Sequence, residues 1–343
     1  MLYGTLPVRP RFITGGRLIQ IADDEGVSTS EPAAETPKEA TTATTTDKQD
    51  GPFKPSIVDV LVVKVMLNRA MNFPPEIVDV VIDLAEYWPS HTVEVNFGEE
   101  SPETVRGRHG HRDNSPEDKF IIRTPPLALE KWGNQGLYRA PVRPKKPAGE
   151  WSTEAFQDLV ASPTALLAHP CRRIVFTLSS HDQGWGGRLN DEEENGPYHG
   201  SWTWFEAGLE RFVRKEEDEK PTLGIEHVRT VYPESLWDSD RDTGHYDFPL
   251  GGSDERKIQA NITADSVFTH HRVVWDYTDD IDPEKDTEAA AKLERLGRGK
   301  ATGNGKFVRE LRIGDMVTVW AKARFPAWCH YISSVKVEVY WAI

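Results

Sequence analysis

The tract SHDQGWGG around His181 holds the residues of this sequence that are best suited to chemistry. An imidazole next to the carboxylate of Asp182 can act as a general base. The pair can also be half of a metal site, which His199 or Glu206 would complete. The alternative is structural: Asp182 caps a tight turn, the glycines adopt positive φ angles and Trp185 closes the end of a core. We favour the structural interpretation, because one loop does not demonstrate convergent catalytic groups.

Large aromatic side chains lie close to this tract. Trp202 and Trp204 are two residues apart, so in a strand they would share one face. Such a pair can stack on a sugar ring or a peptide, although in a sheet it is more often part of the core. The tract ARFPAWCHY repeats the theme with Phe325, Trp328 and Tyr331. If its loop lies at the same end of the fold as the His181 tract, the two form an aromatic cleft.

The predicted ligand-binding residues come from these three tracts. They are His181, Asp182, Gln183, Trp185, Trp202, Trp204, Arg324 and Trp328. The sequence contains no phosphate-binding Gly-rich loop and no HExxH, GxSxG or CxxC motif. We therefore predict no catalytic residue, no bound metal and no cofactor.

The elements that must position these residues are strands. From Trp151 onward apolar and polar residues alternate, which predicts strands at residues 173–179, 201–206, 257–263, 271–277, 316–323 and 335–342. No helix is expected between them, which excludes a parallel α/β sheet. The sequence therefore predicts a mainly β fold, with an antiparallel β-sandwich over residues 151–343.

The region before this sandwich has a different composition. Residues 1–55 are rich in Thr, Ala, Glu, Pro, Lys and Asp, which predicts a disordered arm. Residues 56–97 are predicted to form a small helical element followed by a short strand, and residues 98–150 a loop-rich linker. One helix is expected after Ser56 as N-cap, with an apolar stripe of Val58, Leu61, Val62, Val65 and Met66, although the many β-branched residues also suit a strand. A second is expected after Pro74 and Pro75, with a stripe of Ile77, Val78, Val81, Ile82 and Ala85.

Charge and composition exclude several classes of partner. The chain has 343 residues and a net charge of -14, which repels nucleic acid and anionic lipid, so neither is predicted to bind. No stretch is apolar for 18 residues, and the first residues lack the apolar region of a secretory signal. Cys171 and Cys329 are too few for a disulfide framework. A cytoplasmic or nuclear location is expected.

Two resemblances add to these expectations. The block from Arg173 to Glu206 and the closing tract GDMVTVWAKARFPAWCHYISSVKVEVYWAI resemble a group of uncharacterised fungal proteins with DQGWGG, SWTWFE and VWARARFPGW-type tracts. This resemblance implies a jelly roll like those that bind galactose. Residues 73–84, with FPPEIV followed by Ile82 and Leu84, resemble the opening helix of an F-box, although the later Leu, Cys and Trp pattern is absent.

The F-box resemblance implies docking on a ubiquitin-ligase scaffold through Pro74, Pro75, Glu76 and Ile77. Three functional hypotheses follow from all of these observations. The first is a non-enzymatic adaptor that recognises a protein partner through an aromatic rim of the sandwich. The second is a lectin-like carbohydrate-binding module, acting as an F-box-type receptor. The third is a hydrolase or metal enzyme that uses His181 and Asp182.

Overall fold

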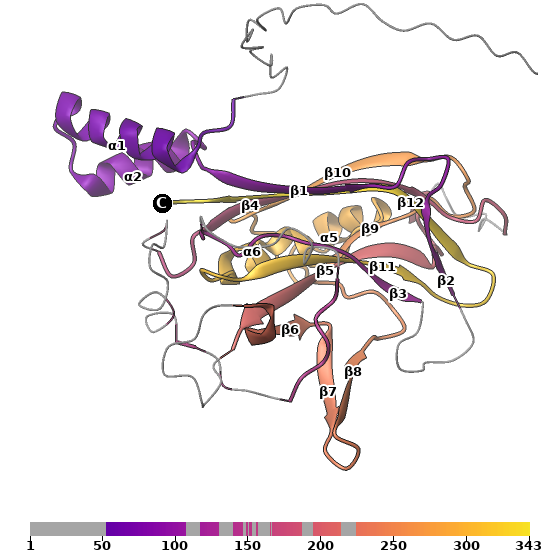
Figure 1. The fold of residues 1–343 in the computed structure, drawn as a ribbon. Helices are drawn as coiled ribbons and strands as arrows, with labels where there is room; N and C mark the ends of the chain where they lie inside the picture. The colour runs from indigo at the N-terminus through magenta and orange to yellow at the C-terminus, as the bar shows by residue number, and fades with distance from the viewer. Residues whose placement is uncertain are drawn as a thin grey trace, which may run out of the picture. The chain divides into compact units, whose positions relative to one another are not determined.

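Two antiparallel sheets form the framework of the part of the chain that the structure describes (Figure 1). In this computed structural model the described residues are 53–107, 117–129, 140–146, 149, 151–152, 156, 165, 167–186, 195–213 and 224–343. The predicted mainly β, antiparallel architecture is confirmed. The predicted disordered arm lies outside the described residues except for its last three. Of these, Phe53 stacks on Tyr87 and Lys54 forms an ion pair with Glu338.

The first sheet runs in the order β1-β12-β4-β10, and β2 also pairs with β12. Its strands are β1 (Ser90–Asn96), β2 (Glu103–Arg106), β4 (Cys171–His181), β10 (Thr269–Asp276) and β12 (Cys329–Trp341). The long strand β12 lies between β1 and β4, with Val337 opposite both Val93 and Phe176. As predicted from the alternation, Val335, Val337, Val339 and Trp341 are all buried.

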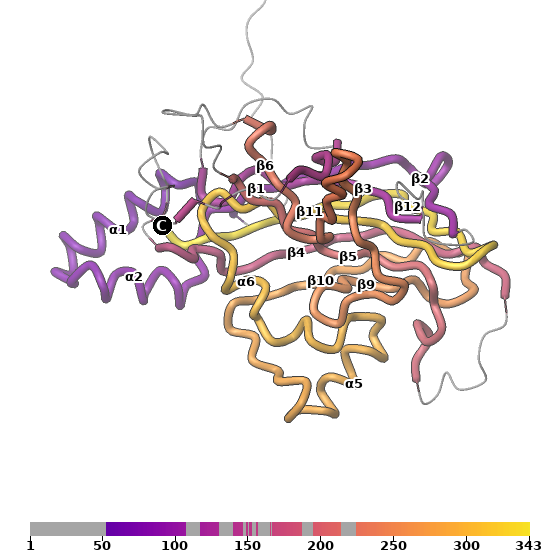
Figure 2. The backbone as a smooth tube through the Cα atoms, turned by 90° about the horizontal axis from the view of Figure 1, so that it is seen from below, coloured from indigo at the N-terminus to yellow at the C-terminus, as the bar shows by residue number. Residues whose placement is uncertain are grey.

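The second sheet runs in the order β3-β11-β5-β6, and β9 also pairs with β5. Its strands are β3 (Asp118–Arg123), β5 (Thr203–Phe212), β6 (Val228–Tyr232), β9 (Lys257–Ala260) and β11 (Met316–Ala323). Strands β11 and β12 are joined by a short turn that crosses from the second sheet to the first. Figure 2 shows the two sheets from below, with helix α5 (Thr287–Arg295) beside β9.

The remaining elements lie around the sheets. They are the helices α1 (Ile57–Met71), α2 (Pro75–Leu84) and α6 (Lys306–Glu310), the 3-10 turns η2 (Ile225–His227) and η3 (Thr302–Asn304), and the hairpin strands β7 (Glu234–Asp238) and β8 (Thr243–Asp247). None of the helices in the described residues combines the length and the apolar content that crossing a bilayer requires.

The core lies between the facing sides of the two sheets. Ile174, Phe176 and Leu178 of β4 belong to the same buried cluster as Val319 and Ala321 of β11. A contact crosses between the sheets where the ring of Phe205 meets that of His330 at 4.5 Å. The apolar residues that alternate along the strands therefore meet in one continuous core, as expected for a sandwich.

The outer side of the second sheet is buried as well, beneath the β7–β8 hairpin and the residues after it. Trp320 of β11 packs against the rings of Tyr246 and Phe248, with centroids 5.7 Å and 5.5 Å away. Between these layers lie charged side chains, among them the fully buried pair Arg123 and Glu210. This covering explains why every residue of β11 is buried although only alternate residues face the core.

Helix α1 turns a different face inward from the one that its sequence suggested. Ser56 caps the helix as predicted, accepting a hydrogen bond from the Asp59 N–H. The side chain that it buries is Val60, which packs in a small cluster with Val78 and Ile82 of α2. The expected stripe of Val58, Leu61, Val62, Val65 and Met66 is exposed. Apolar residues surround this helix, so periodicity alone does not identify the face that packs.

The sheets also recruit elements from regions where none was expected. Strands β2 and β3 come from the stretch that was assigned to the loop-rich linker, and with β1 they pair inside the two sheets before residue 151. Helices α5 and α6 lie between β10 and β11, where no helix was expected. These strands and helices are short and contain many charged residues. The sequence did not predict them, because a strand or helix of a few residues shows little periodicity.

Candidate functional site

One end of the sandwich, which we call the rim, brings together the loops that the sequence analysis singled out. The rim consists of residues 181–186, 201–202, 261–268 and 324–328. The pairing of the strands brings these loops together. His181 at the end of β4 pairs with Tyr331 near the start of β12, and Ala323 at the end of β11 pairs with Thr203 at the start of β5. The adjacency that an aromatic cleft requires is therefore present.

The two sheets are fastened to each other at the rim by buried hydrogen bonds. Asn261 accepts a hydrogen bond from the Ser180 hydroxyl at 2.6 Å and donates one to the Thr203 hydroxyl at 2.8 Å. Ser180 belongs to the first sheet and Thr203 to the second. This bridge fixes the spacing of the loops that carry the rim.

His181 does not act on Asp182 as a catalytic pair would. Its Nδ1 donates to the main-chain carbonyl of Asp182, at 2.5 Å, and its ring stacks on Tyr331 with centroids 4.8 Å apart. The edge of Phe268 packs against the ring from another side. The imidazole is thus held in an aromatic stack and forms no hydrogen bond to the neighbouring carboxylate, so the general-base arrangement is not formed.

The Asp182 carboxylate is a structural anchor with no exposed surface. It accepts hydrogen bonds from the backbone N–H groups of Gly184, Ala264 and Asp265, at 3.0, 2.7 and 2.9 Å. Burial raises the pKa of this carboxyl, while the three N–H donors oppose the rise by stabilising the ionised form. The bond from Gly184 is the turn cap that the structural interpretation anticipated, and the bonds from Ala264 and Asp265, which it did not anticipate, join rim loops 181–186 and 261–268.

We predict that Asp182→Ala lowers the free energy of unfolding by about 2–4 kcal/mol, because it removes one acceptor from three backbone donors in a buried place. Urea unfolding measures the change. Asp238→Ala is the matched control: the Asp238 carboxylate also accepts from two backbone N–H groups, of Asp240 and Arg241, but in an exposed turn where water replaces it. Equal losses for the two variants would contradict the anchor.

Gln183 and Trp185 continue the anchored loop outward. The Gln183 side chain accepts from the Cys329 N–H at 3.3 Å and donates to the Trp185 carbonyl at 2.9 Å. Gly184 and Gly186 have φ angles of 74° and 137°, as the turn requires. Trp185 itself is 60% exposed, so it does not close the core as the structural interpretation supposed. Instead a fixed loop presents its indole to solvent.

The other aromatic residues of the rim flank this position. Trp202 and Trp328 are half-buried, and Phe325 is 39% exposed. The rings of Trp202 and Phe325 meet edge to face at 4.5 Å, and the Arg324 N–H donates to the Trp202 carbonyl at 2.9 Å. Phe325, which was not among the predicted binding residues, is thus part of the accessible aromatic surface.

Trp204 and Arg324, both predicted to bind a ligand, are interior residues. Trp204 is 2% exposed on the covered side of the second sheet, with the Arg324 guanidinium 5.3 Å from its ring centre. Arg324 donates to Asp118 at 2.7 Å and to the Pro249 carbonyl at 3.2 Å. Trp202 precedes the strand, so the two indoles form no common platform. The sequence analysis missed this because it could not reveal the cover over that face.

The proposed metal half-site is not assembled. Glu206 accepts from the indole N–H of Trp204 at 3.2 Å on the covered side of the second sheet, whereas His199 lines a pocket beside α5. Within the described part of the chain, no group of three or more His, Cys, Asp and Glu side chains is placed to hold a metal ion. His181 and Asp182 therefore lack the further ligand that this hypothesis needed.

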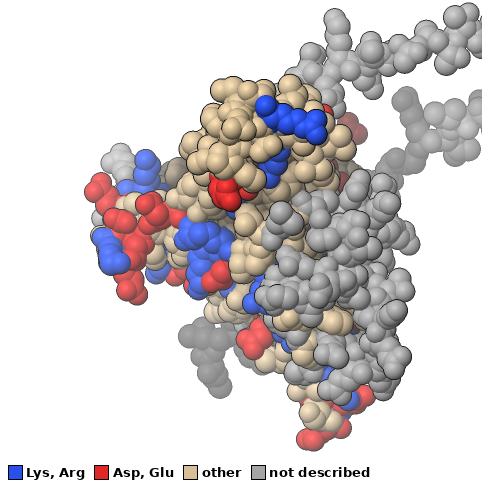
Figure 3. All heavy atoms as spheres, turned by 90° about the vertical axis from the view of Figure 1, so that its left-hand side faces the viewer, with Lys and Arg blue, Asp and Glu red and all other residues tan. Residues whose placement is uncertain are grey.

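A second exposed surface lies on the α1–α2 hairpin, at the opposite end of the sandwich from the rim (Figure 1). Figure 3 views that end and shows a broad area over the hairpin with few charged side chains. Its large exposed aliphatic residues are Val58, Leu61, Val62, Val65, Met66, Met71, Ile77, Val80 and Leu84. The residues implied in docking by the F-box resemblance, Pro74, Pro75, Glu76 and Ile77, are all exposed.

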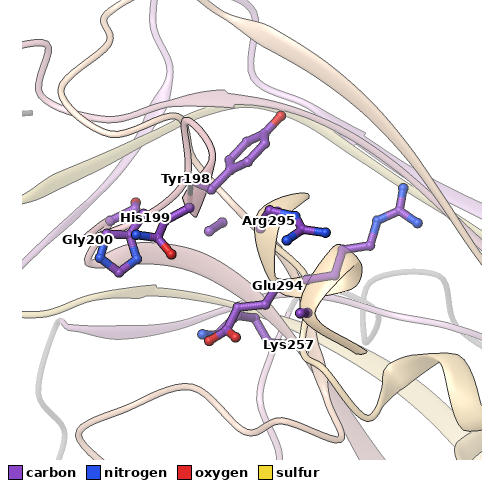
Figure 4. Close-up of a pocket in the computed structure, with 12 residues that line it drawn as sticks. Tyr198, His199, Gly200, Lys257, Glu294 and Arg295 are labelled. Carbon is purple, nitrogen blue, oxygen red and sulfur yellow. The ribbon is translucent and has the colours of Figure 1, made fainter. Parts of the chain in front are cut away.

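A polar pocket of about 240 Å³ opens where β9, α5 and residues 195–201 meet (Figure 4). Lys257, Arg295 and Arg298 supply positive charge to its lining, and Glu294 supplies one carboxylate. The sequence analysis did not identify it, because its residues come from three segments with no motif in common. Helix α5 was also not expected from the sequence.

Comparison with known proteins identifies no relative: no family model, no curated protein and no solved structure matches this chain.

Proposed function

We propose that this chain is a non-enzymatic binding protein that recognises a protein partner through the aromatic surface of the rim. The observation that carries the proposal is the exposed indole of Trp185 on a loop fixed by the buried Asp182 carboxylate. An exposed Trp costs little entropy on binding when its loop is already ordered, and Trp is enriched among residues that dominate interface energies. Phe325, Trp202 and Trp328 would extend the contact.

A protein partner suits this surface better than a small ligand. Three of the pockets on the described surface are lined without any contribution from Trp185, Trp202 or Trp328. The buried position of Trp204 removes the paired indole platform on which the carbohydrate hypothesis rested. A shallow aromatic surface with a polar surround is typical of the centre of a protein interface.

An adaptor also needs a second docking surface, and the α1–α2 hairpin supports one. The exposure of Pro74, Pro75, Glu76 and Ile77 makes the F-box-like docking sterically feasible. The aliphatic side chains around them provide apolar area of the kind that helical partners bury. We propose a ubiquitin-ligase scaffold as the partner there. The rim would then bind the recognised protein, and the hairpin would attach the chain to the scaffold.

We predict that Trp185→Ala weakens partner binding at the rim at least tenfold while leaving the fold intact, because its side chain is exposed and makes no core contact. Proximity labelling in cells with the full chain identifies the partner, and titration of the purified partner measures the affinity. Ile77→Ser is the matched control, an exposed apolar residue at the opposite end of the sandwich.

The pattern of loss separates the two surfaces. A rim partner should be lost with Trp185→Ala and kept with Ile77→Ser, whereas a ligase scaffold should show the reverse. If Trp185→Ala changes no protein interaction and a glycan array gives a Trp185-dependent signal, the carbohydrate hypothesis replaces this one. If Trp185→Ala changes neither protein binding nor glycan binding, the proposal that the rim recognises a partner is wrong.

A further inference from the structure

The pocket beside α5 is built on a fixed frame. The Ala260 N–H of β9 donates to the Gly297 carbonyl at 2.7 Å, and the Gly299 N–H donates to the Lys257 carbonyl at 3.0 Å. The Gln259 side chain adds a bond to the Leu296 carbonyl at 2.7 Å. The segment that follows α5 is thus fastened along β9. Side chains that line the pocket from these two elements are therefore held at constant spacing.

The charge of this pocket is opposite to that of the chain. Three cationic side chains and one carboxylate line it, in a chain with a net charge of -14. In the described part of the chain, none of the three cations forms an ion pair. Lys257 instead lies 5.7 Å from the ring centre of Trp204. An anion that enters the pocket would therefore meet an excess of positive charge over the single carboxylate of Glu294.

Arg298 is the most constrained of the three cations. Its guanidinium is half-buried, and its Nε is buried without a hydrogen-bond partner. Burial lowers its pKa, and the adjacent Tyr198 phenol opposes this. Behind Tyr198, whose ring meets that of His271 at 5.7 Å, the His271 Nε2 is also buried and unbonded. A partly desolvated cation with no counter-ion is costly unless a ligand supplies the negative charge.

We propose that this pocket binds a small oxyanion, either a phosphate or a carboxylate group, with Arg298 and Arg295 as its principal donors. A guanidinium presents parallel N–H groups that match two oxygens of such an anion. The volume of about 240 Å³ admits a compact ligand rather than a drug-sized one, for which pockets of about 300–1,000 Å³ are usual. Glu294 opposes anion binding and would favour a ligand that also carries a hydrogen-bond donor. This site is independent of the rim.

Inorganic phosphate and citrate are titrated as probes into the full chain at constant ionic strength. Binding is measured by calorimetry and by the amide NMR shifts of residues 195–201 and 297–299. We expect Arg298→Gln and Arg295→Gln each to weaken binding by about tenfold, equivalent to about 1.4 kcal/mol. Glu294→Gln should strengthen it. Arg241→Gln, which removes an equal charge from an exposed turn, should leave it unchanged.

Each result decides the proposal. Binding of one probe but not the other assigns the anion class, and stronger binding at low salt supports the charge argument. Should Arg298→Gln fail to fold, Arg295→Gln decides alone, because Arg295 is exposed and its loss does not threaten the fold. The proposal is overturned if neither anion shifts the pocket amides, or if the pocket variants bind as tightly as Arg241→Gln.

Discussion

Replacement of Arg123 by methionine is expected to lower the free energy of unfolding by about 3–5 kcal/mol, the cost of leaving one partner of a buried ion pair without its counter-ion. Arg123 and Glu210 are 1% and 0% exposed. The guanidinium holds both carboxylate oxygens, through Nε and through Nη2 at 2.8 Å. The variant leaves the Glu210 charge buried beneath the β7–β8 hairpin, where water cannot replace the lost donor. Urea unfolding measures the change.

Two further variants separate the charge effect from loss of packing. Arg123→Met combined with Glu210→Leu should recover most of the loss, because no charge then remains buried. Lys285→Met removes an exposed ion pair with Asp282 and should cost about 0.5 kcal/mol or less. A loss below about 1 kcal/mol for Arg123→Met alone would mean that the outer layer is hydrated in solution.

The free energy of unfolding is expected to fall as the pH drops from about 6.5 to about 4, because burial, complete for His330 and partial for His91 and His271, favours the neutral form of three histidines. Burial lowers the pKa of His330 to about 3, and that of His91 and His271 to about 4. Each folded-state pKa lies below the unfolded value of 6.5, so the unfolded chain binds more protons throughout this interval. Their contribution is complete above pH 6.5 and is lost as acid is added, at roughly 1.4 kcal/mol per pH unit for each histidine.

His330 allows a direct check of this pH dependence. Its Nδ1 donates to the Lys322 carbonyl at 3.2 Å, and its Nε2 is buried without a partner, so protonation would bury an unpaired charge between the sheets. Burial raises the pKa of Asp182 and Asp315, which act in the opposite direction at the lower end of the interval. His330→Gln should therefore flatten the pH dependence between pH 6.5 and 5. Identical slopes for the variant and the natural chain would contradict the assignment.

The alternation of residues predicted the sandwich because each long strand has one side in the core. Strand β11 was placed at its observed ends, and β12 was recognised from its row of valines. The short strands β7 and β8 were missed, since their sequences ESLWD and TGHYD show no strong period. Missing this hairpin also hid the cover on the second sheet. That explains why Trp204 and Arg324 were expected at the surface.

The rim was located in part from the sequence. The tracts around His181 and Trp328 were recognised by their aromatic and glycine content, but their proximity depends on pairing between β4 and β12 over a long sequence separation. The composition of the first tract also does not reveal which of its residues is buried as an anchor and which is exposed. Asp182 is the anchor and Trp185 the exposed group, and only the hydrogen bonds to residues 264 and 265 distinguish them.

The central position of β12 has a consequence for biosynthesis. Strands β1 and β2 are made early, yet both pair with β12, which leaves the ribosome more than 200 residues later. At synthesis rates of about 5–20 residues per second, these early strands wait on the order of 10–50 seconds with unpaired edges. The sandwich therefore closes only after β12 has emerged, and chaperones that shield strand edges would raise the yield of folded protein.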